Sequence, residues 1–128
     1  MSDGFFLAHY LTRYRKKLNI IVAGYAASMA AVILASGGKN FNITRYCYPS
    51  TYALIHDGYV SVAPSETKTA NDIMIFNAKV DANIRQFIID NTNITAEQYD
   101  GQARKQWFIE AQEMKKLNLI DEIIGSGM

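Results

Sequence analysis

Residues 18–38 form the longest uncharged stretch of this 128-residue chain and lie between Lys17 and Lys39. A membrane-spanning helix needs roughly 20 consecutive apolar residues, so length alone would permit a span here. The stretch also contains Asn19, Gly24 and several alanine and serine residues, which favour transfer into lipid only weakly. Its composition therefore argues against a membrane span.

The secondary structure that the residues of this stretch favour changes partway along it. "LNIIVA" (18–23) is rich in β-branched residues and is followed by a glycine, which is typical of a buried strand. "AASMAAVILAS" (26–36) is rich in helix formers and is followed by Gly37-Gly38, a common helix stop. We therefore predict a strand over 18–23, a turn at Gly24-Tyr25 and a buried helix over 26–36, rather than a membrane span.

Ser28 lies close to the predicted junction of this strand and helix. A helix N-terminus offers unpaired N–H groups and the positive end of the helix dipole, which suits a nucleophile or a developing oxyanion. The N–H of Met29 would face such an oxyanion. From this stretch alone two interpretations stay open: Ser28 is an exposed nucleophile, or it is one small residue in a tightly packed helix.

The composition indicates an ordinary globular chain. Lys and Arg number 13 and Asp and Glu 12, which gives no general reason to expect nucleic acid or anionic lipid as a partner. The single cysteine, Cys47, cannot form an internal disulfide, and the N-terminus lacks the order of a secretory signal. We expect a cytoplasmic protein. Neither a P-loop nor a Cys/His cluster is present in the sequence, so we expect no cofactor and no metal.

The remaining segments alternate between helical and extended patterns. Apolar residues at helical spacing predict an amphipathic helix over 4–14, in which His9 is structural, and a long helix over 69–91 with apolar residues on more than one side. Strands are predicted at 45–48, 52–56 and 59–62, the last two joined by a hairpin at Asp57-Gly58. A capping box at 95–98 opens a short helix through 102, a helix runs from about 111 to 118, and 119–124 forms a closing strand or short segment.

Four of these segments together resemble a known family. "GYAASMAAVILASGGK", then "YPSTYALIHDG", then a long amphipathic helix and a closing "NLIDEII" are similar to the Clp protease proteolytic subunit, including its phage-borne relatives. The resemblance extends from about Gly4 to Ile124. It implies a single peptidase domain over 1–128 with an α/β, ClpP/crotonase-like fold, in which residues 57–91 form the "handle" region.

The resemblance also implies a catalytic site. The family's nucleophile maps onto Ser28 and its general base onto His56, with the N–H of Met29 in the oxyanion hole. Alignment of the closing motif places Gln106 where the triad aspartate belongs. An amide can accept a hydrogen bond from the imidazole but cannot stabilise its positive charge, and Asp100 could substitute only through a distorted register. We therefore expect impaired activity.

The family forms stacked seven-membered rings, so the resemblance implies a homo-oligomer that acts on peptides or unfolded proteins, together with a Clp ATPase or a complete ClpP. Asp3-Gly4 resembles the residues after the family's glycine-rich strand. We therefore expect an N-terminally shortened, phage-like form that lacks the second oxyanion donor. Two alternatives to a serine endopeptidase follow: a catalytically silent ring subunit with a structural or regulatory role, and, less favoured because crotonases lack a Ser/His dyad, an acyl-CoA enzyme.

Overall fold

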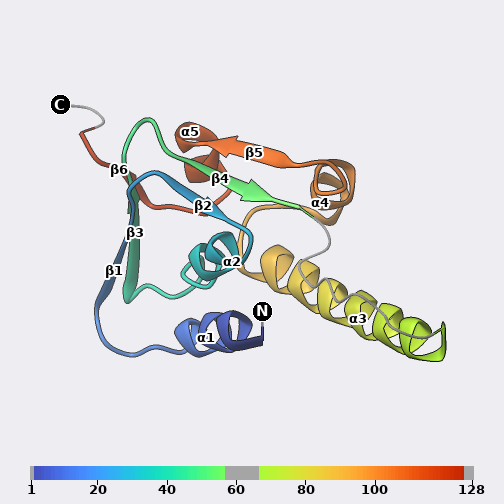
Figure 1. The fold of residues 1–128 in the computed structure, drawn as a ribbon. Helices are drawn as coiled ribbons and strands as arrows, with labels where there is room; N and C mark the ends of the chain where they lie inside the picture. The colour runs from blue at the N-terminus through green and yellow to red at the C-terminus, as the bar shows by residue number, and fades with distance from the viewer. Residues whose placement is uncertain (1, 57–66, 126–128) are drawn as a thin grey trace.

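The computed structural model describes residues 2–56 and 67–125, which form a mixed α/β fold (Figure 1). The α/β class predicted from the sequence is confirmed. The predicted hairpin at Asp57-Gly58 and the strand at 59–62 lie outside the described residues. The elements, in chain order, are α1 (Ser2–Thr12), β1 (Leu18–Val22), β2 (Tyr25–Ala27), α2 (Met29–Ala35), β3 (Ile43–Cys47), β4 (Tyr52–Ile55), α3 (Thr67–Asn91), α4 (Ala96–Gln102), β5 (Trp107–Glu110), α5 (Ala111–Lys116) and β6 (Glu122–Ile123).

The strands form two three-stranded sheets. The first has the order β1-β3-β6 and is parallel throughout, and the second has the order β2-β4-β5, with β2 and β4 parallel and β4 and β5 antiparallel. Only two residues separate β1 from β2, and only four separate β3 from β4. The chain therefore passes twice from the first sheet into the second, which brings β2 and β4 side by side with the same direction.

The helix predicted over 26–36 begins later than expected. Tyr25–Ala27 is a strand that pairs with Tyr52–Leu54, and α2 starts at Met29. The alanines at 26 and 27 favour a helix by propensity, but pairing with β4 overrides that preference. The α2 helix is buried, as predicted, and lies between α1 and α3. Within 2–56 and 67–125, no helix is long and apolar enough to cross a membrane.

Only part of the apolar spacing predicted for α1 faces the core. Ala8 and Leu11 are buried, whereas the apolar Leu7 and Tyr10 are exposed. The ring of His9 lies 4.5 Å from that of Phe5 and 4.8 Å from that of Phe87, centroid to centroid. These edge contacts join α1 to α3, which agrees with the structural role expected for His9.

The C-terminal third holds both a confirmed prediction and an unexpected strand. Thr95 and Gln98 form the predicted capping box, in which each side chain bonds the backbone N–H of the other residue. Asn118, predicted to stop the preceding helix, has a φ of 62°, the left-handed conformation of a helix stop. Residues 107–110, which carried no strand prediction, form β5 at the edge of the second sheet.

A buried cation in the middle of β3 joins several elements of the fold. The Arg45 side chain is fully buried and donates to both carboxylate oxygens of Asp121, at 3.0 Å each. Its guanidinium also donates to the carbonyls of Leu34, at 2.9 Å, and Asn118, at 2.7 Å. The Leu34 carbonyl lies in the last turn of α2 and also accepts from the Gly37 N–H, at 3.2 Å. Arg45 therefore ties α2 to the segment that follows α5.

Stability is expected to fall in acid because of this ion pair. Burial opposes ionisation of Asp121, but hydrogen bonds from the Arg45 side chain and backbone outweigh it, so the pKa of Asp121 lies below its ordinary 3.8. A carboxyl whose pKa is lowered on folding contributes stability above its unfolded pKa and loses it as pH falls through the folded pKa. We expect the urea concentration at the unfolding midpoint to decrease as the pH is lowered below about 4. The decrease should be less steep in Asp121→Asn.

The matched control is Asp100→Asn. The hydrogen bond from Arg85 also lowers the pKa of Asp100, but that pair is exposed, and solvent screens it. Asp100→Asn should therefore leave the acid dependence close to that of the unmodified protein. Equal flattening in the two variants would contradict the assignment to Asp121.

Candidate active site

Ser28 occupies a strained junction between β2 and α2. Its φ is 54° and its ψ −120°, a backbone conformation that residues other than glycine rarely adopt. Three backbone hydrogen bonds hold it there: its N–H donates to the Leu54 carbonyl at 3.1 Å, and its carbonyl accepts from the Ala31 N–H at 3.1 Å and the Val32 N–H at 3.4 Å. A sharp strand-to-helix turn of this kind exposes a serine hydroxyl in α/β hydrolases. The geometry thus differs from that of a serine inside a packed helix.

His56 follows β4, the strand beside β2. The parallel register pairs Ala27 with Leu54, so Ser28 and His56 both emerge at the carboxyl ends of adjacent strands. The Ser28 Oγ lies 3.0 Å from the His56 Nε2, in a partly buried setting. The two side chains that the sequence predicted to meet are therefore within hydrogen-bond distance, as proton transfer between them requires.

Met29 begins α2 immediately after Ser28. The first N–H groups of a helix have no carbonyl partner within it, and Ala31 already uses the Ser28 carbonyl. Within the described residues, the Met29 N–H donates to no backbone carbonyl outside α2. The Met29 side chain packs closely on α1, since a Cβ added at Gly4 would collide with its Cγ. This contact fixes the first turn of α2 and explains why only glycine fits at position 4.

Gln106 lies directly before β5. The antiparallel register pairs Trp107 with Ile55, and one further step places Gln106 opposite His56. The side chain is exposed, and no hydrogen bond joins it to His56 among the described residues. The backbone position thus matches that of a third triad member, while the side chain makes no such contact.

Asp100, the alternative third member, is engaged elsewhere. Its carboxylate accepts two hydrogen bonds from Arg85 of α3, at 2.8 and 3.0 Å. This bidentate pair orients the carboxylate toward α3. In the part of the chain that is described, no group of three or more His, Cys, Asp or Glu side chains could hold a metal ion.

Sequence reasoning did not identify the Leu54 carbonyl, which anchors the Ser28 backbone from the strand that carries His56. No sequence signal marks a backbone acceptor, because every residue offers one. Only the pairing of β2 with β4 reveals it.

Comparison with protein families gives a match over almost the whole chain: the model of the Clp protease family matches residues 1–127. The match includes the strand–helix junction at Ser28, the strand end at His56 and the β5 segment after Gln106. A resemblance first seen in three short motifs thus extends over the full fold. The chain belongs to the Clp protease family.

Proposed function

We propose that this protein is a serine peptidase subunit of the Clp type, with Ser28 as nucleophile and His56 as general base. The observation that carries the proposal is the 3.0 Å separation of the Ser28 Oγ and the His56 Nε2 at a strained strand-to-helix turn. Nucleophilic serines are activated by an adjacent base in this way. Membership of the family supports the same reaction class.

In the proposed mechanism the Ser28 Oγ attacks the peptide carbonyl as its proton passes to the His56 Nε2. The Met29 N–H donates to the oxyanion that forms, and His56 then returns the proton to the leaving amine. Water, activated by the same imidazole, releases the acyl group from Ser28. An oxyanion donor of this kind contributes about 3 to 4 kcal/mol to transition-state stabilisation.

A fluorophosphonate probe tests the nucleophile directly. We expect the probe to label the unmodified protein, because an activated serine attacks the phosphorus centre, and labelling to vanish in Ser28→Ala. Ser50→Ala is the matched control: Ser50 is an exposed serine in the turn before β4, and its loss should leave labelling unchanged. Labelling is read by intact-protein mass spectrometry.

A second candidate function is a catalytically silent ring subunit, and Gln106 is the observation that favours it. A glutamine at this position cannot supply the counter-charge that an aspartate would give to the imidazolium formed during catalysis. A folded sample that takes up no probe and cleaves no peptide would remove the peptidase proposal and leave this one.

We also propose that the protein self-associates through α3. Met74, Ile75 and Phe76 on this helix are 66%, 58% and 60% exposed. Figure 1 shows the first half of α3 extending away from the other described elements. Exposed apolar clusters of this kind mark interaction surfaces. The rings formed by the family are the expected product, with peptides or unfolded proteins as substrates.

Sedimentation velocity tests this assembly. We expect an oligomer at micromolar concentration and dissociation in an Ile75→Glu, Phe76→Glu double variant, because buried charges are costly at an apolar interface. Lys79→Glu, an exposed change on the same helix, is the control for charge alone. A monomer at every concentration in the unmodified protein would contradict the proposal.

A further inference from the structure

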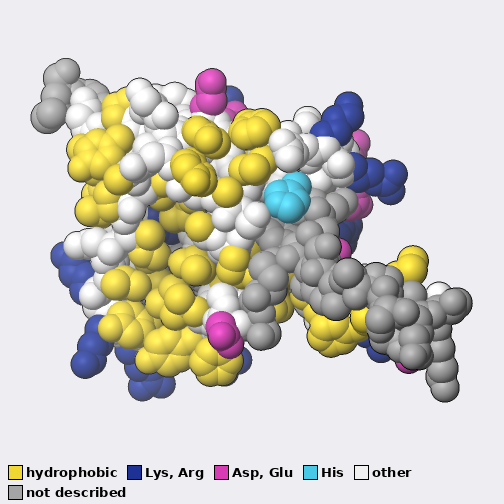
Figure 2. All heavy atoms as spheres, in the orientation of Figure 1, with side chains coloured by type: hydrophobic (Ala, Val, Ile, Leu, Met, Phe, Trp, Pro, Cys, Tyr) yellow, Lys and Arg dark blue, Asp and Glu magenta, His cyan; other side chains and the backbone are white. Residues whose placement is uncertain are grey.

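Among the described residues, nothing covers one face of the second sheet. Along β4 the residues alternate, with Ala53 and Ile55 buried and Tyr52 and Leu54 partly exposed. Because side chains alternate across a strand, Tyr52, Leu54 and His56 share the uncovered face. Figure 2 shows hydrophobic side chains gathered over this part of the molecule. The uncovered face thus leads along β4 to the candidate active site.

Aromatic rings line this face. Tyr25 stacks on Tyr52 across the β2–β4 pair with ring centroids 5.6 Å apart, and Tyr52 lies 5.8 Å from Phe108 of β5. Tyr25 and Phe108 are 66% and 57% exposed. Stacked rings present π-faces that attract cations, and guanidinium groups above all.

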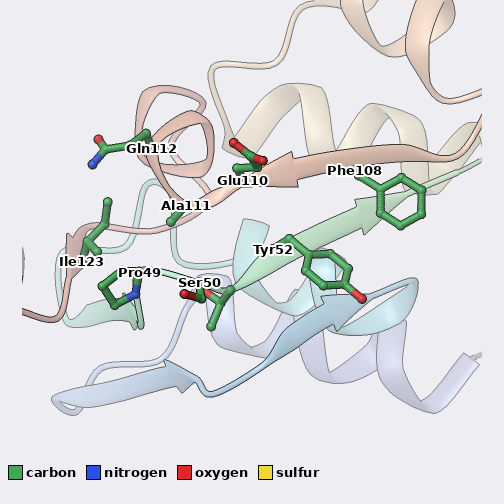
Figure 3. A pocket seen from close by; sticks show the side chains of 9 residues that line it. Pro49, Ser50, Tyr52, Phe108, Glu110, Ala111, Gln112 and Ile123 are labelled. Carbon is green, nitrogen blue, oxygen red and sulfur yellow. The ribbon is translucent and has the colours of Figure 1, made fainter.

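A pocket of about 540 Å³ opens at the end of the aromatic row that is remote from His56. Its lining includes Pro49, Ser50, Tyr52, Phe108 and Glu110. Figure 3 shows the Tyr52 and Phe108 rings toward one end of the pocket and Ile123 toward the other, with the Glu110 carboxylate between them. The pocket therefore combines an apolar wall with a single acidic group.

The charge of this pocket is unbalanced. Glu110 is the only charged residue among the described residues that line it. The carboxylate does not cap α5, and it has neither a salt bridge nor a hydrogen bond in the described part of the chain. A glutamate carries a negative charge at neutral pH. An unpaired carboxylate beside aromatic rings suits a cation with an apolar stem, which is the chemistry of arginine and lysine side chains.

We propose that this pocket is a subsite for a basic side chain, arginine above lysine, of the peptide that the protein cleaves. This inference rests on the proposed peptidase function. Tyr52 and His56 lie four residues apart on one strand, so the pocket is about 13 Å from the imidazole at 3.3 Å per residue. An extended peptide spans that distance in about four residues. The preferred basic residue is therefore three to five residues from the scissile bond, on one side only.

The binding contacts follow from the lining. The guanidinium donates to the Glu110 carboxylate while its flat face and methylene stem lie against the Tyr52 and Phe108 rings. A neutral glutamine in the same place loses the charge attraction, and a glutamate is repelled. Exposed ion pairs and cation–π contacts together correspond to about a three- to tenfold preference for arginine over glutamine.

The test uses quenched-fluorescence peptides that differ only in carrying Arg, Gln or Glu at each of the positions two to six residues from the cleaved bond. We expect kcat/KM to be about three- to tenfold higher for Arg than for Gln at three to five residues, and the ratio to fall to about one in Glu110→Gln. The control, Glu113→Gln, removes an equal charge from α5 without touching the pocket and should keep the preference. Glu110→Lys should reverse it in favour of Glu.

Binding to Ser28→Ala separates this inference from the peptidase function. Fluorescence anisotropy of labelled Arg and Gln peptides measures the subsite even where no peptide is cleaved, and the same dependence on Glu110 is expected. Cleavage or binding that shows no preference for Arg, or a preference unchanged in Glu110→Gln, would overturn the proposal. So would a Glu110→Gln variant whose sedimentation changes while its peptide preference does not, because the pocket would then be covered by a second copy.

Discussion

Gln106→Asp is expected to raise peptide turnover by about 10²- to 10⁴-fold, because it restores a carboxylate opposite His56. The β4–β5 register sets residue 106 opposite residue 56, so the new side chain starts from a suitable backbone position. In serine proteases with a complete triad, the aspartate fixes the imidazole tautomer and stabilises the imidazolium, and its change to asparagine lowers turnover about 10⁴-fold. The gain should appear in kcat rather than in KM, since the carboxylate acts on the transition state.

Gln106→Asn is the control for this gain. Asparagine has nearly the size of aspartate but no charge, so it should leave turnover near that of the unmodified protein. The measurement is steady-state hydrolysis of one fluorogenic peptide by all three proteins. An aspartate variant that labels normally with the fluorophosphonate yet cleaves no faster would show that residue 106 does not orient His56.

Arg45→Met is expected to lower the free energy of unfolding by about 1 to 3 kcal/mol, the usual cost of removing the donor from partly buried acceptors, because the Asp121 side chain is 36% exposed and stays partly solvated. Methionine fills a similar volume, but the Asp121 carboxylate and the Leu34 and Asn118 carbonyls lose the hydrogen bonds that the guanidinium donates. The end of α2 and the segment leading into β6 are then joined by fewer bonds, chiefly those from Asn118 to the Gly38 carbonyl and between the residue 45 backbone and Asp121. Urea unfolding followed by circular dichroism at neutral pH measures the loss.

Two further variants show which property of Arg45 is responsible. Arg45→Lys keeps the charge but lacks the planar fork that reaches several acceptors at once, so its loss of stability should be smaller but still clear. Arg13→Met removes an exposed cation at the end of α1 and should change the stability by less than about 0.5 kcal/mol. Equal stability of Arg45→Met and Arg13→Met would mean that the buried network contributes nothing.

Local signals predicted the parts of the fold whose causes are local. The capping box at Thr95 and the left-handed stop at Asn118 depend on residues within one or two turns, and both are confirmed. Long periodic segments gave α1 and α3 to within a few residues. The face of α1 was harder, because which side is buried depends on where α2 and α3 lie.

Long-range pairing explains what could not be predicted. The strand at Tyr25–Ala27 exists because it pairs with a segment 27 residues later. The types of these three residues do not indicate which segment that is. Arg45 is a second case: a charge in a strand usually faces solvent, and its partner Asp121 is 76 residues away. The contact between Ser28 and His56 was predicted only through resemblance to a family, because no local sequence pattern indicates a contact between residues 28 positions apart.

The bond from the Ser28 N–H to the Leu54 carbonyl couples the proposed nucleophile to the strand that ends just before the proposed base. A rigid shift of either sheet or of the surrounding helices would carry both groups together and leave their spacing intact. Separation of hydroxyl from imidazole would need a turn of one side chain or a rupture of the β2–β4 pair. The spacing of the proposed nucleophile and base is thus set when β2 pairs with β4, and it needs no further element to maintain it.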